Sequence, residues 1–166
     1  MTSSSLDLLA EAFAARRLPK DAWTHEAHLR VGAWHVHRFG GTVALERLRA
    51  GIRALNDAHG VANTATGGYH ETITTAYVRL LEQFLAGMEH GVPLEDGVAR
   101  LLGSPLADKQ ALLTFWSKEL LMSPRARAEW VPPDVAPLTL SAVPERGHAA
   151  TSCLNRLDSR LKNPSV

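Results

Sequence analysis

The sequence predicts an all-α protein, an up-down four-helix bundle core with additional short C-terminal helices and an extended tail. Apolar residues recur at helical spacing along nearly the whole chain, and no strand-like alternation of useful length is present. Glycine and proline interrupt this pattern where helices of ordinary length would end. With 166 residues, the chain is long enough for one domain with a substantial core. We assign residues 1–142 to this domain and residues 143–166 to a flexible tail.

The first two helices have clear start and stop signals. Ser4 or Ser5 caps a first helix, which ends before Pro19 because proline interrupts a helix. A second helix begins near Thr24, a suitable N-cap. It ends at Gly40-Gly41, because glycine commonly terminates helices.

The next two helices flank a loop. The third helix is expected over residues 42–59 and stops at Gly60. Residues 61–68 are rich in loop-forming residues and predict a loop. A fourth helix starts at Tyr69, carries the clearest apolar stripe in the chain and ends at Gly91.

The remainder of the chain predicts shorter elements. Helices are expected over residues 94–102 and 107–122, and a last turn or two over residues 123–130. Prolines then favour an extended segment, and from Pro144 onward the apolar content is thin. Within that tail, three leucines are spaced for a short amphipathic helix: Leu154, Leu157 and Leu161.

Composition and charge disfavour several classes of protein. A formal net charge of +1 gives no strong field toward nucleic acid or an acidic membrane. The single cysteine, Cys153, excludes an internal disulfide framework and a multi-cysteine zinc site. No apolar run approaches the roughly 18 residues of a membrane span, and no secretion signal is visible. We expect a cytoplasmic protein with a small-molecule substrate or ligand, and a homo-oligomer is compatible with the sequence.

Four histidines near the ends of predicted helices form the most informative pattern. His25 and His28 open the second helix, His59 closes the third and His70 opens the fourth. Successive helices joined by short connections run antiparallel, so these ends would meet at one end of a bundle. The sequence therefore predicts a histidine cluster that forms a metal or acid/base site.

Imidazole is a common ligand for transition metals. His25 and His28 lie three residues apart on one helical face, so both rings can reach one ion. With His70 as third ligand, an open position would hold a water of pKa near about 7. We predict a divalent transition metal bound by His25, His28 and His70, and these ligands do not distinguish zinc, iron and copper.

Three further residues are candidates for catalytic roles. His59 would be a fourth ligand or a proton carrier. Glu71 lies about 100° around the helix from His70, so it would orient a ligand or move a proton from outside the ligand set. Tyr77 follows His70 by seven residues on the same helical face and would line the site, with Trp23 as a possible wall.

Two known metal motifs do not fit. The segment His70-Glu71-Thr72-Ile73-Thr74 has threonine where an HExxH motif requires its second histidine. A carboxylate-bridged di-iron site would need Glu-x-x-His motifs that the chain lacks at matching positions.

The sequence leaves two hypotheses for the function of the protein. The leading hypothesis is a small metal-dependent enzyme, hydrolytic with zinc or oxidative with iron or copper. The alternative is a non-catalytic helical protein that binds a small molecule or a partner, with structural histidines. His59 illustrates the alternative, because a helix C-terminus favours a protonated imidazole.

Two segments also resemble the signatures of an uncharacterised family of small bacterial helical proteins. Residues 23–30 read WTHEAHLR, an aromatic-x-His-x-x-His stretch, and residues 69–74 read YHETIT. Residues 121–124, LMSP, add to the resemblance, which covers roughly residues 20–140. It implies that the histidines of the first two segments act together, and it implies no reaction.

Overall fold

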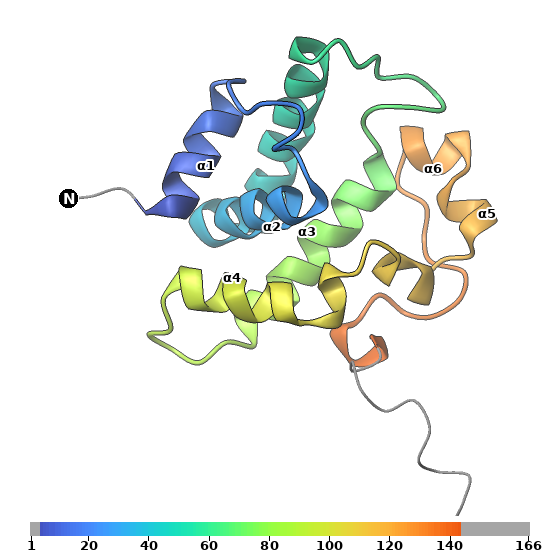
Figure 1. Ribbon diagram of the computed structural model, residues 1–166. Helices are drawn as coiled ribbons and strands as arrows, with labels where there is room; N and C mark the ends of the chain where they lie inside the picture. The colour runs from blue at the N-terminus through green and yellow to red at the C-terminus, as the bar shows by residue number, and fades with distance from the viewer. Residues whose placement is uncertain (1–3, 144–166) are drawn as a thin grey trace, which may run out of the picture.

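The computed structural model describes residues 4–143, which are helical and contain no strand. The all-α prediction is therefore confirmed for this part of the chain (Figure 1). None of its helices has both the length and the apolar character needed to cross a membrane. The expected amphipathic segment around Leu157 lies outside the described residues. The helices are α1 (Ser5–Ala14), α2 (His25–Ala58), α3 (Glu71–Ala86), α4 (Leu94–Gly103), α5 (Lys118–Leu121) and α6 (Pro124–Ala128), with short 3-10 helices η1 (Pro105–Ala107), η2 (Ala111–Thr114) and η3 (Leu140–Ala142).

The long helices begin at side-chain caps. Ser4 and Asp7 form a reciprocal capping box at the start of α1. The Thr24 hydroxyl accepts a hydrogen bond from the Ala27 amide at the start of α2. At the start of α3 the ring of His70 accepts the capping hydrogen bond, a role that sequence patterns do not assign to histidine. These caps explain why the observed starts of α1 and α2 agree with the predicted ones.

Helix α2 bends sharply at Gly40, where the backbone has φ 72° and ψ 163°. Its first half (residues 25–39) and its second half (residues 41–58) correspond to the second and third predicted helices, so the predicted break at Gly40-Gly41 is confirmed. In Figure 1 the second half turns steeply away from the first. The expected up-down four-helix bundle is not confirmed, because a left-handed glycine joins the two halves at an angle rather than folding them back.

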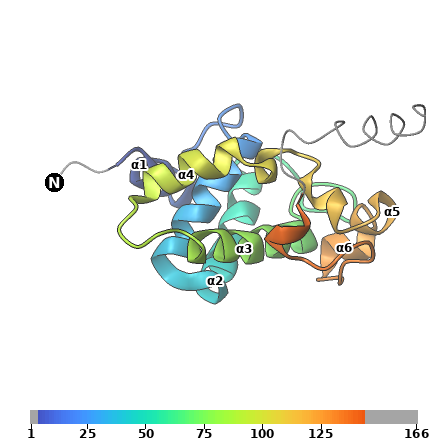
Figure 2. The ribbon, with the colours of Figure 1, turned by 90° about the horizontal axis from the view of Figure 1, so that it is seen from below.

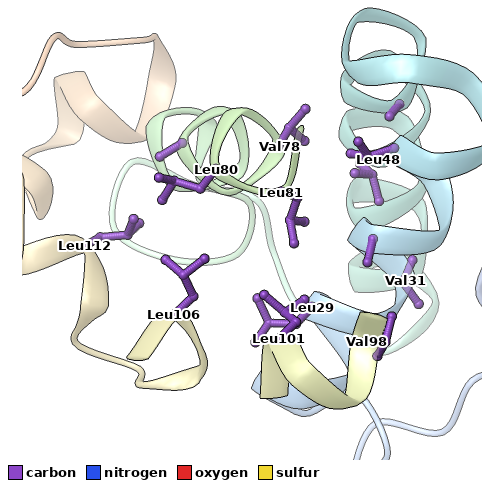
Figure 3. Packing of buried hydrophobic residues seen from close by; sticks show 14 of the residues in the cluster. Leu29, Val31, Leu48, Val78, Leu80, Leu81, Val98, Leu101, Leu106 and Leu112 are labelled. Carbon is purple, nitrogen blue, oxygen red and sulfur yellow. The ribbon is translucent and has the colours of Figure 1, made fainter. Parts of the chain in front are cut away.

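Helix α3 lies at the centre of the molecule. Figures 1 and 2 place α1 and α4 at one end, α5 and α6 at the other, and α3 between them. Val78 and Leu81 point from α3 toward α2 and α4, whereas Leu80 points toward Leu106 and Leu112 (Figure 3). All five side chains are buried, so α3 contributes to the core on both sides.

The predicted helix over residues 107–122 is wrong. The chain forms η1, η2 and α5 there instead of one continuous helix. Trp116 is fully buried, and Asp134 accepts hydrogen bonds from the amide and hydroxyl of Ser117. These bonds hold Ser117 in an extended conformation, at ψ 148°, as the N-cap of α5. Tertiary contacts with the chain after α6 thus override the local helical pattern.

Candidate functional site

A cavity of about 310 Å³ lies between the two halves of α2 and helix α3. Its volume is at the lower end of the roughly 300–1,000 Å³ typical of small-molecule sites. Most of the lining is apolar, with a few polar side chains. The lining residues are Trp23, His25, His28, Leu29, Gly32, Leu48, Ile52, Ile73, Thr74, Tyr77, Val78, Leu81 and Lys109.

Each helix contributes one face to this cavity. The first half of α2 presents His25, His28, Leu29 and Gly32, which are spaced by three, four and seven residues from His25. Gly32 lets α3 approach closely, because a Cβ atom at position 32 would lie 2.8 Å from Cδ1 of Leu81 on α3, so that side chain would have to move. The close approach of these two helices therefore closes the cavity on one side.

Two polar atoms beside the cavity have no hydrogen-bond partner among residues 4–143. They are Nε2 of His25 and the hydroxyl of Tyr77, and both are buried. The two rings meet edge to face, with centroids 5.6 Å apart. Buried polar atoms are nearly always hydrogen-bonded, and an unpaired one commonly marks the place of a water or a ligand. The pair thus provides hydrogen-bonding capacity that the described part of the protein does not use.

His28 and Trp23 form the aromatic wall of the cavity. Their rings stack with centroids 3.7 Å apart. The Nδ1–H of His28 donates to the carbonyl oxygen of Thr24 at 2.7 Å, since a carbonyl can only accept. In the neutral ring this leaves the Nε2 lone pair of His28 free to accept a hydrogen bond or bind a metal.

Both histidines of the cavity favour the neutral form. Burial lowers the pKa of His25, and the nearby charge of Lys109 lowers it further. Desolvation by the surrounding groups also lowers the pKa of His28, although the residue is partly exposed and its hydrogen bond to Thr24 acts in the opposite direction. Burial raises the pKa of Tyr77 to about 12, and the charge of Asp108 adds to that shift. At neutral pH the site therefore presents uncharged imidazoles and a protonated phenol, with Lys109 as its nearby cation.

The other two predicted histidines do not line this cavity. The Nε2–H of His70 donates to the Leu121 carbonyl at 2.9 Å, and its Nδ1 accepts from the Ile73 amide at 3.3 Å. Both ring nitrogens are thus engaged, and His70 joins α3 to α5. His59 donates from Nε2 to the Leu18 carbonyl at 2.8 Å, which joins the end of α2 to the chain after α1.

Glu71 also lies apart from the cavity lining, where its buried carboxylate pairs with the half-exposed Arg49. Arg49 donates to both of its carboxylate oxygens, and the Nε–Oε2 distance is 2.9 Å. The hydroxyls of Tyr69 and Thr75 donate to the same carboxylate. Burial alone would raise the pKa of Glu71, but the hydrogen bonds from Arg49 and Tyr69 lower it below its usual value. A carboxylate held by four donors is suited to joining helices rather than to moving protons.

The predicted ligand set is therefore not assembled. Within residues 4–143, no group of three or more histidine, cysteine, aspartate or glutamate side chains is placed to hold a metal ion. His25 and His28 share the cavity with Tyr77 and Trp23, whereas His59, His70 and Glu71 are bonded elsewhere. The sequence did not predict that Lys109 lines the cavity; it lies in the turn between η1 and η2, within the segment expected to form one continuous helix.

No family model matches the chain, and no curated protein or solved structure is significantly similar to it. The resemblance to the bacterial helical family thus stays a prediction, and the cavity is interpreted from its own chemistry.

Proposed function

We propose that this protein binds a small, largely apolar molecule that carries at least one hydrogen-bonding group. The observation that carries the proposal is the pair of unpartnered polar atoms, His25 Nε2 and Tyr77 OH, beside an otherwise apolar cavity. An apolar cavity with a few directed polar groups is the usual form of a small-molecule site. This is the second of the two functions that the sequence suggested.

The lining favours an amphipathic, planar ligand. The apolar faces of α2 and α3 would bury its body, and the stacked rings of Trp23 and His28 favour a flat group. Tyr77 is protonated at neutral pH and would donate to a ligand oxygen or nitrogen. Lys109 is exposed and lines the same cavity, so it favours a ligand with a negative charge at its outer end.

The experiment uses the dye anilinonaphthalene sulfonate, an anionic aromatic molecule that fluoresces in apolar surroundings. We expect saturable, one-to-one binding to the native protein. Ile52→Trp, which fills the cavity from the second half of α2, should abolish it. Leu8→Trp is the matched control, because Leu8 is exposed on α1 and outside the lining. Equal binding by the Ile52→Trp variant would overturn the proposal.

A metal-dependent enzyme is the second candidate. His25 and His28 line the same cavity, and the buried Nε2 of His25 has no hydrogen-bond partner among residues 4–143. Two imidazoles with open positions filled by water or substrate would suit a divalent transition metal. Elemental analysis of untagged protein tests this candidate. Stoichiometric metal that disappears in the His25→Ala, His28→Ala double variant would support it, and metal-free protein after incubation with zinc, iron and copper would reject it.

A further inference from the structure

A second pocket, of about 460 Å³, lies where the loop between α2 and α3 meets α6. Arg53 reaches it from α2 and Arg127 from α6. Among the described residues, no aspartate or glutamate lines it. Two guanidinium groups thus face one pocket whose described lining contains no balancing negative charge.

Arg53 has no carboxylate partner in the described part of the chain. The arginines of the ion pairs there are Arg30, Arg49 and Arg125. The guanidinium of Arg53 instead lies over the ring of Tyr69, 4.5 Å from its centroid. This cation–π contact orients the guanidinium and leaves its charge unneutralised.

Arg127 is held by neutral groups. Its Nη1 donates to the carbonyl oxygens of Gly68 and Tyr69 at 3.1 and 3.2 Å. Its Nε–H is buried and has no acceptor among residues 4–143. The side chain is therefore fixed at the pocket and still has a donor available.

The loop that frames the pocket is preformed. Oδ1 of Asn63 accepts hydrogen bonds from the Tyr69 amide and from the side chain of Asn56, both at 2.9 Å. The Thr64 hydroxyl accepts from the Gly67 amide at 3.1 Å. Because the loop is already ordered by these bonds, a ligand would bind without the entropic cost of folding it.

We propose that this pocket binds a small molecule that carries a phosphate group. Guanidinium forks match phosphate oxygens in geometry and form strong charge-assisted hydrogen bonds with them. Two arginines carry two positive charges, which balance the −1.5 to −2 or so of a phosphate monoester at neutral pH better than the single charge of a carboxylate. The site is separate from the apolar cavity, so it does not depend on the proposed function.

Inorganic phosphate is the probe, and the arginine Nε–Hε signals are followed by NMR at constant ionic strength. We expect saturable shifts of the Arg53 and Arg127 signals in the native protein. Arg53→Gln should weaken phosphate binding about tenfold or more, which is the loss of one charge-assisted hydrogen bond. Arg53 is exposed, so this variant should fold normally.

Arg125→Gln is the matched control, because Arg125 is also on α6 but pairs with Glu129 and is outside the pocket. Its phosphate affinity should equal that of the native protein. Arg127→Lys, which keeps the charge and loses the fork, should bind more weakly than native. Shifts that do not saturate, or an equal effect of Arg53→Gln and Arg125→Gln, would overturn the proposal.

Discussion

The edge of one aromatic ring meets the face of another where His25 and Tyr77 pack together, with centroids 5.6 Å apart. The contact joins the start of α2 to the middle of α3, and each residue contributes a buried polar atom without a partner among residues 4–143. Such atoms reduce the stability of the free protein, since each loses its hydrogen bonds to water on folding. A ligand that forms the missing hydrogen bonds would therefore raise the free energy of unfolding, because it binds the native state.

Tyr77→Phe should leave the ligand-free protein equally stable or raise its free energy of unfolding by up to about 1 kcal/mol, because it removes an unpaired hydroxyl. Urea denaturation measures this change. Tyr69→Phe is the matched control, since the Tyr69 hydroxyl donates to Glu71 at 2.9 Å. That variant should lose about 1–2 kcal/mol. A similar loss in Tyr77→Phe would mean that its hydroxyl is already bonded.

Glu71→Gln should lower the free energy of unfolding by about 2 kcal/mol, because it breaks the pair with Arg49. The expected loss is smaller than the roughly 3–5 kcal/mol of a fully buried pair, since the Arg49 side chain is 36% exposed. Glu26→Gln breaks the exposed pair with Arg30 and should change stability by less than about 0.5 kcal/mol. Dye binding to the cavity should be unchanged in Glu71→Gln. If the variant instead lost dye binding while its free energy of unfolding stayed the same, Glu71 would be part of the functional site.

Acid should destabilise the protein through His70. Burial lowers the pKa of His70 below its ordinary 6.5, although its bond to Leu121 partly opposes this shift. The unfolded chain therefore takes up a proton at His70 at higher pH than the folded protein does, so stability falls as pH drops below about 6.5. Protonation also removes the Nδ1 lone pair that accepts from the Ile73 amide.

Thermal midpoints measured from pH 7 to pH 5 test this dependence. His70→Asn keeps a helix-capping side chain without a titrating ring, so its midpoint should fall less steeply. His37→Asn replaces an exposed histidine of α2 and should follow the native curve. If the thermal midpoints of the native protein and His70→Asn fell in parallel, His70 would not be the source of the acid sensitivity.

Gly40→Ala should lower the free energy of unfolding by about 1–2 kcal/mol, because alanine is strained at φ 72°. Space is not the cause, since a Cβ atom at position 40 would meet nothing within 4 Å. Gly103→Ala at the end of α4 also has open space and no positive φ, so it should be neutral or slightly stabilising. Urea denaturation measures both changes. If the two substitutions changed the free energy of unfolding equally, a side chain at position 40 would not strain the backbone.

The sequence predicted local structure better than it predicted the site. The caps at Ser4 and Thr24 and the break at Gly40 follow from single-residue chemistry, and the structure contains all three. Periodicity placed His25, His28 and Tyr77 on inward faces, and these three do line one cavity. An apolar stripe gives the side of a helix that is buried but not the angle at which the next helix crosses it.

The missing crossing angle explains why three of the predicted site residues, His59, His70 and Glu71, do not line the cavity. The ring of His70 caps its own helix and reaches Leu121, a contact across 51 residues that no local pattern reveals. Glu71 looked like a proton carrier because its partner, Arg49, lies 22 residues earlier in the sequence. Lys109 lies in the turn between η1 and η2, where the sequence predicted a continuous helix, and it lines the cavity from there.

The left-handed glycine in α2 sets the dimensions of the cavity from outside it. His25, His28 and Leu29 stand on one arm of the bent helix, whereas Leu48 and Ile52 stand on the other. A change of a few degrees at Gly40 would widen or narrow the gap between these arms without altering any side chain that a ligand touches. Under the proposed function, the size of the ligand would therefore be set by a backbone dihedral angle, and selectivity could be re-engineered there while the binding chemistry is left intact.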